Sequence, residues 1–144
     1  MRYLGIDPGA KRTGLAMGDD ETGLASPLAS PPVAPNGVLT HGSDAERLAG
    51  LLKVIDREAP DALVLGLPLN MDGTAGPSAE AAQRLAATLR ERSGLSVHLQ
   101  DERRTSMRAD DQMARTGLTH GQKKARRDAL AAAHLLRDFL ARAD

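Results

Sequence analysis

The fold of this chain is decided by one uninterrupted apolar run, Ala62-Leu63-Val64-Leu65-Gly66-Leu67. A strand that is apolar at every position is covered on both faces, which is typical of the parallel strands of an α/β sheet. A second candidate for a parallel strand lies further along the chain, at Leu95–Leu99. The two segments predict neighbouring parallel strands in a sheet that has helices on its faces.

The segments around the first apolar run carry helix signals. Ser43 and Glu46 have the spacing of a capping box, and a helical apolar stripe follows them until Pro60. After the run, Pro77 suits the first turn of a helix, and Gly94 suits a left-handed C-terminal cap. Each predicted parallel strand is therefore preceded by a helix, as in a βα crossover.

The two ends of the chain complete the expected fold. Two more helices are expected, from Thr105 to about Gly117 and over Arg127–Ala141, and the proline-rich Ser26–Gly42 is expected to be a surface loop. Three short extended segments, joined by turns, favour an antiparallel meander: Arg2–Ile6, Thr13–Gly18 and Gly23–Ala29. The prediction is an α/β fold with a mixed five-stranded sheet (three antiparallel strands of a meander plus two parallel strands) flanked by helices.

Length and composition limit the possible functions. With 144 residues, the chain is expected to form one domain over residues 1–144. It has no cysteine, which excludes thiol catalysis, cysteine-bound zinc, iron–sulfur clusters and disulfides. We find no leader-like segment and no apolar run of the roughly 18 residues that a membrane span needs. A soluble, cytoplasmic protein without a membrane partner is expected.

The net charge is zero, yet basic residues are concentrated in one segment. Arg103–Arg127 contains eight Lys or Arg against two Asp, a net charge of +6. Such a patch indicates an anionic partner, although a solvated basic helix and loop would have the same composition. Tyr3 and Phe139 are the only aromatic residues, so we expect a nucleic acid to be held mainly through its phosphates.

Acidic residues stand where two predicted strands end. Asp7 ends the first strand, and Asp101-Glu102 follow the last one. In such sheets, chemistry gathers beyond the carboxyl ends of the strands. Asp128 shares one face of the last predicted helix with apolar residues at i+4, i+7 and i+11, so it is expected to point toward the same sheet.

Each acid also has an ordinary structural explanation. Asp7 precedes Pro-Gly, which is normal turn chemistry, and Asp128 could interact with the start of its own helix or with Arg126 or Arg127. Together, however, three or four carboxylates without cysteine or clustered histidine favour a hard cation, Mg²⁺ or Mn²⁺. Acids for a metal beside bases for phosphate are the arrangement that a nuclease needs.

Four blocks of the chain, in order, resemble the YqgF/RuvX family. The most specific of them contains Gly66-Leu67-Pro68-Leu69-Asn70-Met71-Asp72-Gly73, and the third, Asp101-Glu102-Arg103-Arg104-Thr105-Ser106, resembles an Asp-Glu-Arg-Leu-Thr-Thr motif. The blocks span nearly the whole chain: Leu4–Ala16, Val64–Pro77, Asp101–Ser106 and Arg127–Leu136. Arg104, which stands where the family usually has an apolar residue, and the long Ser26–Gly42 loop depart from the pattern.

The resemblance implies a ribonuclease-H-like fold and a divalent-metal nuclease. It implies processing of the 5′ end of pre-16S ribosomal RNA or, alternatively, resolution of Holliday junctions in DNA recombination and repair. Carried over to this chain, the family's catalytic acids fall on Asp7, Glu102 and Asp128, and these are the expected metal ligands. Asp101 is a further candidate, either for the metal or for supporting its ligands.

Candidate contacts to nucleic acid surround these acids. Asn70 follows the middle parallel strand and is expected at the same sheet edge, although an ordered turn explains it equally well. Lys11 and Arg12 lie just beyond Asp7, where exposed basic turn residues are also common. The remaining candidates belong to the basic segment: Arg103, Arg104, Lys123, Lys124, Arg126 and Arg127.

Three other hypotheses stay open at this point. Asp7-x-Gly9-x-x-x-x-Gly14 is similar to the phosphate loop of actin-like ATPases, which need a second such domain to close over a nucleotide. A nucleic-acid-binding module that has lost catalysis is another possibility, and the intact set of acids argues against it. Resolution of a junction would favour a homodimer that places two sites on symmetric strands, whereas a monomer would favour single cuts.

Overall fold

The computed structural model describes residues 1–29, 33, 34, 37–102 and 120–142, with only the backbone described over 120–129. The helices are α1 (Asp44–Glu58), α2 (Pro77–Ser93) and α4 (His120–Arg142). The strands are β1 (Arg2–Asp7), β2 (Arg12–Asp19), β3 (Ala25–Pro27), β4 (Val38–Thr40), β5 (Ala62–Leu67) and β6 (Val97–Asp101). The helix expected over residues 105–117 lies outside the described residues.

The strands form one mixed sheet in the order β3-β2-β1-β5-β6, with β4 also paired to β2. Strand β2 is antiparallel to β1, β3 and β4, whereas β5 is parallel to both of its neighbours, β1 and β6. The mixed sheet, with its meander and its two parallel strands, is therefore confirmed.

The predicted number of strands was wrong, because the structure has a sixth strand inside the expected loop Ser26–Gly42. Strands β3 and β4 share one edge of β2: β3 pairs with Ala16–Gly18, and β4 pairs with Arg12–Gly14. Val38 and Leu39 of β4 are buried in that position. An eight-residue strand leaves more edge than the short β3 covers, so the end of the loop returns to pair with the remainder.

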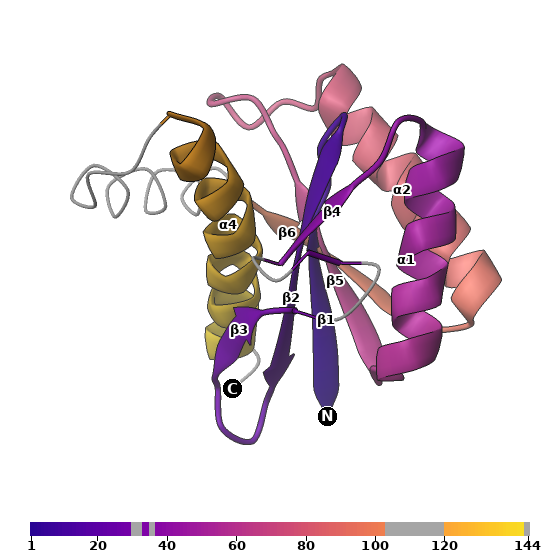
Figure 1. The fold of residues 1–144 in the computed structure, drawn as a ribbon, viewed down its shortest axis with the longest axis vertical. Coiled ribbons are helices and arrows are strands. Elements are labelled where there is room, and N and C mark those ends of the chain that lie inside the picture. The colour runs from indigo at the N-terminus through magenta and orange to yellow at the C-terminus, as the bar shows by residue number, and fades with distance from the viewer. Residues whose placement is uncertain (30–32, 35–36, 103–119, 143–144) are drawn as a thin grey trace.

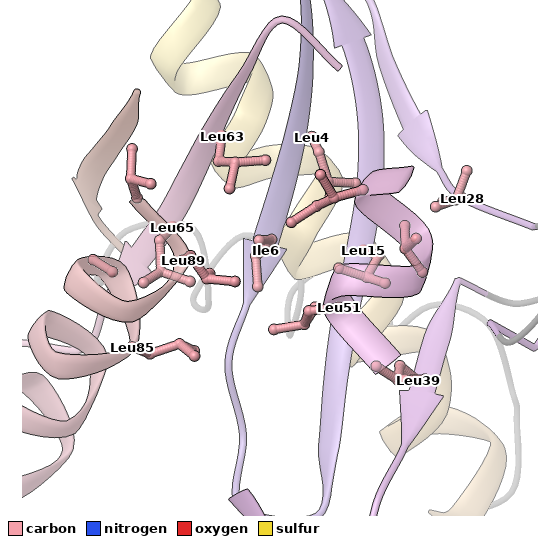
Figure 2. Close-up of a cluster of buried hydrophobic side chains, with 14 of the residues drawn as sticks. Leu4, Ile6, Leu15, Leu28, Leu39, Leu51, Leu63, Leu65, Leu85 and Leu89 are labelled. Atoms are coloured by element: carbon pink, nitrogen blue, oxygen red, sulfur yellow. The ribbon is translucent and has the colours of Figure 1, made fainter. Parts of the chain in front are cut away.

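Helices cover the two faces of the sheet separately, with α4 on one face and α1 and α2 on the other (Figure 1). Each face has its own apolar core. Leu4 and Ile6 of β1 belong to the core under α1 and α2, drawn in Figure 2, whereas Tyr3 belongs to the core under α4. Since side chains alternate along a strand, Gly5 and Asp7 are on the α4 side.

The helix ends confirm the capping signals. Ser43 Oγ accepts a hydrogen bond from the amide of Glu46 at 3.1 Å, and α1 ends at Ala59, which adopts a left-handed conformation with φ of 48°. Helix α2 begins at Pro77 and ends at Gly94, also left-handed with φ of 74°. None of the described helices is long and apolar enough to cross a membrane.

Two boundaries differ from the prediction. Strand β6 runs over Val97–Asp101, two residues later than expected, because the turn at Gly94 continues until the Ser96 carbonyl accepts a hydrogen bond from the Leu63 amide. Asp101 is therefore the last residue of the strand. Helix α4 begins at His120, well before the expected Arg127, since its first turns lack the periodic apolar stripe by which a helix is predicted.

Candidate active site

Two carboxyl groups meet at one edge of the sheet. Asp7 is the last residue of β1, and Glu102 is the first residue after β6. Strand β5 lies between these two strands. The side chain of Glu102 nevertheless forms a hydrogen bond with that of Asp7. The predicted convergence of these two acids is therefore present in the structure.

A glycine in the middle strand makes this contact possible. Ile6 of β1 pairs with Leu65 of β5, and Gly66 of β5 pairs with Gln100 of β6. Gly66 thus lies between the ends of the two outer strands. A Cβ built on Gly66 would lie 2.7 Å from Leu135 Cδ1 and closer still to an Oε of Glu102. The carboxyl of Glu102 occupies the space that any other residue would fill.

The surroundings of Glu102 favour its protonated form. Burial raises the pKa of Glu102 to about 10, with further contributions from the hydrogen bond to Asp7 and from the negative charges of Asp7 and Asp101. A protonated Glu102 donates a hydrogen bond to the Asp7 carboxylate. With no cation beside it, Glu102 keeps this proton at neutral pH and shares it with Asp7 through the hydrogen bond.

Helix α4 brings position 128 toward this pair. A Cβ on Gly5 would lie 3.3 Å from the carbonyl oxygen of Ala132, and one on Gly18 would lie 3.1 Å from Leu140 Cδ1. Since Gly18 pairs with the second residue of β1, α4 runs antiparallel to β1. Position 128, one turn before Ala132, is therefore displaced toward the end of β1 that carries Asp7. The side chain of Asp128 lies outside the described residues, so its role stays a prediction.

The chemistry of the site fits a hard divalent cation. Two carboxyls held so close that they retain a proton would lose it to solvent on binding a cation, and oxygen ligands are those that Mg²⁺ and Mn²⁺ prefer. Within the described part of the chain, no group of three or more His, Cys, Asp or Glu side chains is arranged to hold a metal ion. A site with three carboxylate ligands would need a further acid, for which Asp128 is the predicted residue, with Asp101 as a neighbour of the pair.

The predicted nucleic-acid contacts are less well placed. Lys11 is exposed in the turn between β1 and β2, and Arg12 begins β2. Asn70, in the loop after β5, donates a hydrogen bond from Nδ2 to Thr74 Oγ1 at 3.0 Å, as expected of an ordered turn. The other candidates have undescribed side chains (Lys123, Lys124, Arg126 and Arg127 in α4) or lie outside the described residues (Arg103 and Arg104).

Sequence reasoning missed two residues. Gly66 carried a usable signal, because a glycine inside an apolar strand often marks a close approach by another group. The sequence around Arg47 of α1 gave no signal of its role. Its Nη1 donates a hydrogen bond to the carbonyl of Gly9 at 3.1 Å, which ties the helix to the turn after Asp7. This contact joins residues 38 positions apart, and no local sequence pattern predicts it.

The chain matches the profile of a known family, described as "RuvX: Holliday junction resolvase", over residues 1–142. It belongs to the RuvX family. Two relatives named "Putative pre-16S rRNA nuclease" are each 43% identical to this chain. The one from Opitutus terrae aligns over 97% of this RuvX-family chain and 91% of its own, and that from Azotobacter vinelandii over 96% and 92%. The protein is thus a nuclease, an enzyme that hydrolyses phosphodiester bonds.

Solved structures support the fold. The Thermus thermophilus RuvC in complex with a Holliday junction substrate has a TM-score of 0.56 and 20% identity, covering 99% of this chain and 96% of its own. The Holliday junction resolvase of fowlpox virus has a TM-score of 0.59 and 13% identity, covering 99% of both chains. At these identities the likeness concerns the fold alone, and it confirms the expected ribonuclease-H-like architecture.

Replacing Gly66 by alanine tests whether the Glu102 carboxyl needs the space beside this glycine. In Gly66→Ala the new methyl group collides with Glu102 and Leu135, so the variant is expected to lose about 1–3 kcal/mol of unfolding free energy, as overpacked sites do. Urea denaturation at neutral pH measures this. Gly42→Ala is the control, since its Cβ would meet only the flexible end of Glu46. Equal stability of the two variants would contradict the crowding at Gly66.

The shared proton predicts a pH dependence of stability. Without metal, the folded pair keeps a proton that the unfolded chain loses above the ordinary glutamate value of 4.5. The unfolding free energy of the wild type should therefore fall as pH rises toward 10, by at most about 1.4 kcal/mol per pH unit. Glu102→Gln keeps a neutral donor, so its curve should be flatter. Urea denaturation in EDTA from pH 5 to 8 checks this, with the exposed Glu91→Gln as control. Parallel curves for wild type and Glu102→Gln would disprove the shared proton.

Proposed function

We propose that this protein is a divalent-metal-dependent nuclease that trims the 5′ end of pre-16S ribosomal RNA. The proposal rests mainly on the pair formed by Asp7 and Glu102 at the carboxyl edge of the sheet. It is supported by relatives that carry the name of this activity at 43% identity. A ribosomal RNA substrate would place the protein in the cytoplasm.

In this proposal Asp7, Glu102 and Asp128 hold the metal, Mg²⁺ or Mn²⁺, with Asp101 beside them. The bound metal would activate the attacking water and stabilise the leaving oxygen. The chain's own residues prepare the site: Asp7 and Glu102 give up their shared proton, and Gly66 leaves room for the Glu102 carboxyl. The phosphate backbone is held by the basic and amide side chains: Lys11, Arg12, Asn70, Arg103, Arg104, Lys123, Lys124, Arg126 and Arg127.

Resolution of Holliday junctions is the second candidate, because the family description names that activity. The same metal chemistry would serve either substrate. A junction has two symmetric strands to cut, so this function calls for a homodimer, whereas 5′-end trimming does not. The ATPase and the non-catalytic binding module lose support, since membership of a nuclease family and the paired acids both favour cleavage.

Cleavage by wild type and Asp7→Asn tests the proposal. With Mg²⁺ or Mn²⁺, the wild type should shorten an end-labelled ribosomal RNA precursor, and Asp7→Asn should do so at least about 100-fold more slowly, the scale of losing one group that stabilises the transition state. Asp56→Asn, an exposed acid on α1, should cut like the wild type. A labelled four-way DNA junction in parallel separates the two substrates. Equal rates for wild type and Asp7→Asn would refute the nuclease site.

Metal-dependent melting tests the third ligand. Mg²⁺ or Mn²⁺ should raise the melting temperature of the wild type more than that of Asp128→Asn, because a cation that binds only the folded state stabilises it according to its affinity. Differential scanning fluorimetry over a metal titration measures both shifts. Asp138→Asn, on the same helix near its end, is the matched control. If wild type and Asp128→Asn shift equally, Asp128 is not a ligand.

A further inference from the structure

A cavity of about 310 Å³ lies beyond the ends of β1 and β5. Its walls come from three elements: the turn Pro8–Ala10 after β1, Arg47 from α1, and Ser78 and Ala81 from the first turns of α2. Pro68, directly after β5, Asp44 of α1 and Ala82 of α2 also line it. Segments far apart in the sequence thus converge on one cavity at the edge of the sheet where ligands of α/β proteins bind.

The cavity is adjacent to the carboxyl pair. Pro8 directly follows Asp7, and Pro68 directly follows Leu67, whose carbonyl accepts a hydrogen bond from the Glu102 amide at 3.4 Å. The cavity lies against α1 and α2, whereas the carboxyl pair lies on the α4 side of the sheet. The turn Pro8–Ala10 joins the two places, because it lines the cavity and continues directly from Asp7.

Most of the lining is apolar and made of small residues, with one cation among them. The Arg47 side chain is only 11% exposed. Its Nη1 is bound to the Gly9 carbonyl, and its Nη2 is 3.5 Å from the exposed Asp44 carboxylate. Among the described residues, its buried Nε has no hydrogen-bond partner. These contacts hold the guanidinium in place, and its plane suits stacking against the face of a base.

The tyrosine and the phenylalanine of this chain are engaged with each other. Tyr3 and Phe139 are its only aromatic residues apart from histidine, and they pack against each other with ring centroids 5.3 Å apart. Both lie in the core under α4. Among the described residues, the cavity supplies aliphatic walls and one arginine plane against which an unpaired base can pack.

We propose that this cavity is a subsite for one unpaired nucleotide of the substrate strand, next to the bond that is cut. This rests on the proposed nuclease function. The volume is at the low end of small-molecule pockets, which favours one nucleotide over a base pair. Asp44 in the same wall repels a free phosphate, so the base, held against Pro8, Pro68 and Ala81, supplies the recognition. Single-stranded RNA is commonly read in this manner, one splayed base at a time.

Titration of the full-length protein with mononucleotides tests the subsite. Amide shifts in NMR spectra are followed while adenosine or uridine 5′-monophosphate is added, with ribose 5-phosphate and inorganic phosphate as separate arms. The mononucleotides should give saturable shifts at Ala10, Ser78 and Ala81. Absence of such shifts overturns the proposal. Equal shifts with inorganic phosphate also overturn it, since they would assign the cavity to a phosphate.

Substitutions that fill the cavity with a larger side chain test the subsite, and Ala81→Leu has a matched control on the same helix. Ala81→Leu should weaken mononucleotide binding at least tenfold, whereas Ala87→Leu, at an exposed position of the same helix, should bind like the wild type. Ala10→Leu fills the cavity from the opposite wall and serves if Ala81→Leu fails to fold. Unchanged binding in a folded filling variant overturns the subsite.

Cleavage separates this proposal from the function on which it rests. Asp7→Asn should keep mononucleotide binding while losing cleavage. On a substrate with one abasic position beside the cut, the wild type should cleave as slowly as Ala81→Leu does. The abasic position should not change the cleavage rate of Ala81→Leu. If mononucleotides bind but the wild type cuts no nucleic acid, the nuclease function fails and the cavity remains a nucleotide-binding site without a cut bond beside it. If the wild type cuts normal and abasic substrates equally, the subsite fails and the nuclease function stands.

Discussion

The missing side chain at Gly66 is the constraint on which the site depends. Asp7 and Glu102 come from strands that are not neighbours, and the strand between them separates their backbones by two inter-strand spacings, roughly 10 Å. Their carboxyls meet because the middle strand has only a hydrogen at that point. Leu135 from α4 packs close to the same glycine, so a larger side chain at position 66 would collide with both Leu135 and Glu102.

The two adjacent carboxyls lower the stability of the folded protein while forming the candidate metal site. Two carboxyls placed together at a partly buried position are unfavourable when both are charged, and the raised pKa of Glu102 reflects that cost. A divalent cation removes the repulsion, so the same feature that destabilises the free protein stabilises the bound one. Burial of apolar side chains in the two cores, one on each face of the sheet, offsets this loss of stability.

Local signals predicted most of the fold. The ends of α1 and α2 were predicted correctly, because Ser43, Pro77 and Gly94 act on the backbone within one turn of their own positions. Strand β4 was missed, because it exists only through pairing with the uncovered edge of β2. The two-residue shift of β6 has the same kind of cause, since its register is set by hydrogen bonds to β5.

The sequence by itself determined most of the elements, the order of the acids along the chain and the family, because caps, apolar periods and motifs are local properties that can be recognised without coordinates. Only the tertiary structure decided that Glu102 reaches Asp7 across Gly66, that Arg47 fastens the turn after Asp7, and that a cavity opens beside them. These features depend on which residues far apart in the chain share the same space, and that is settled by sheet order and packing rather than by any local pattern.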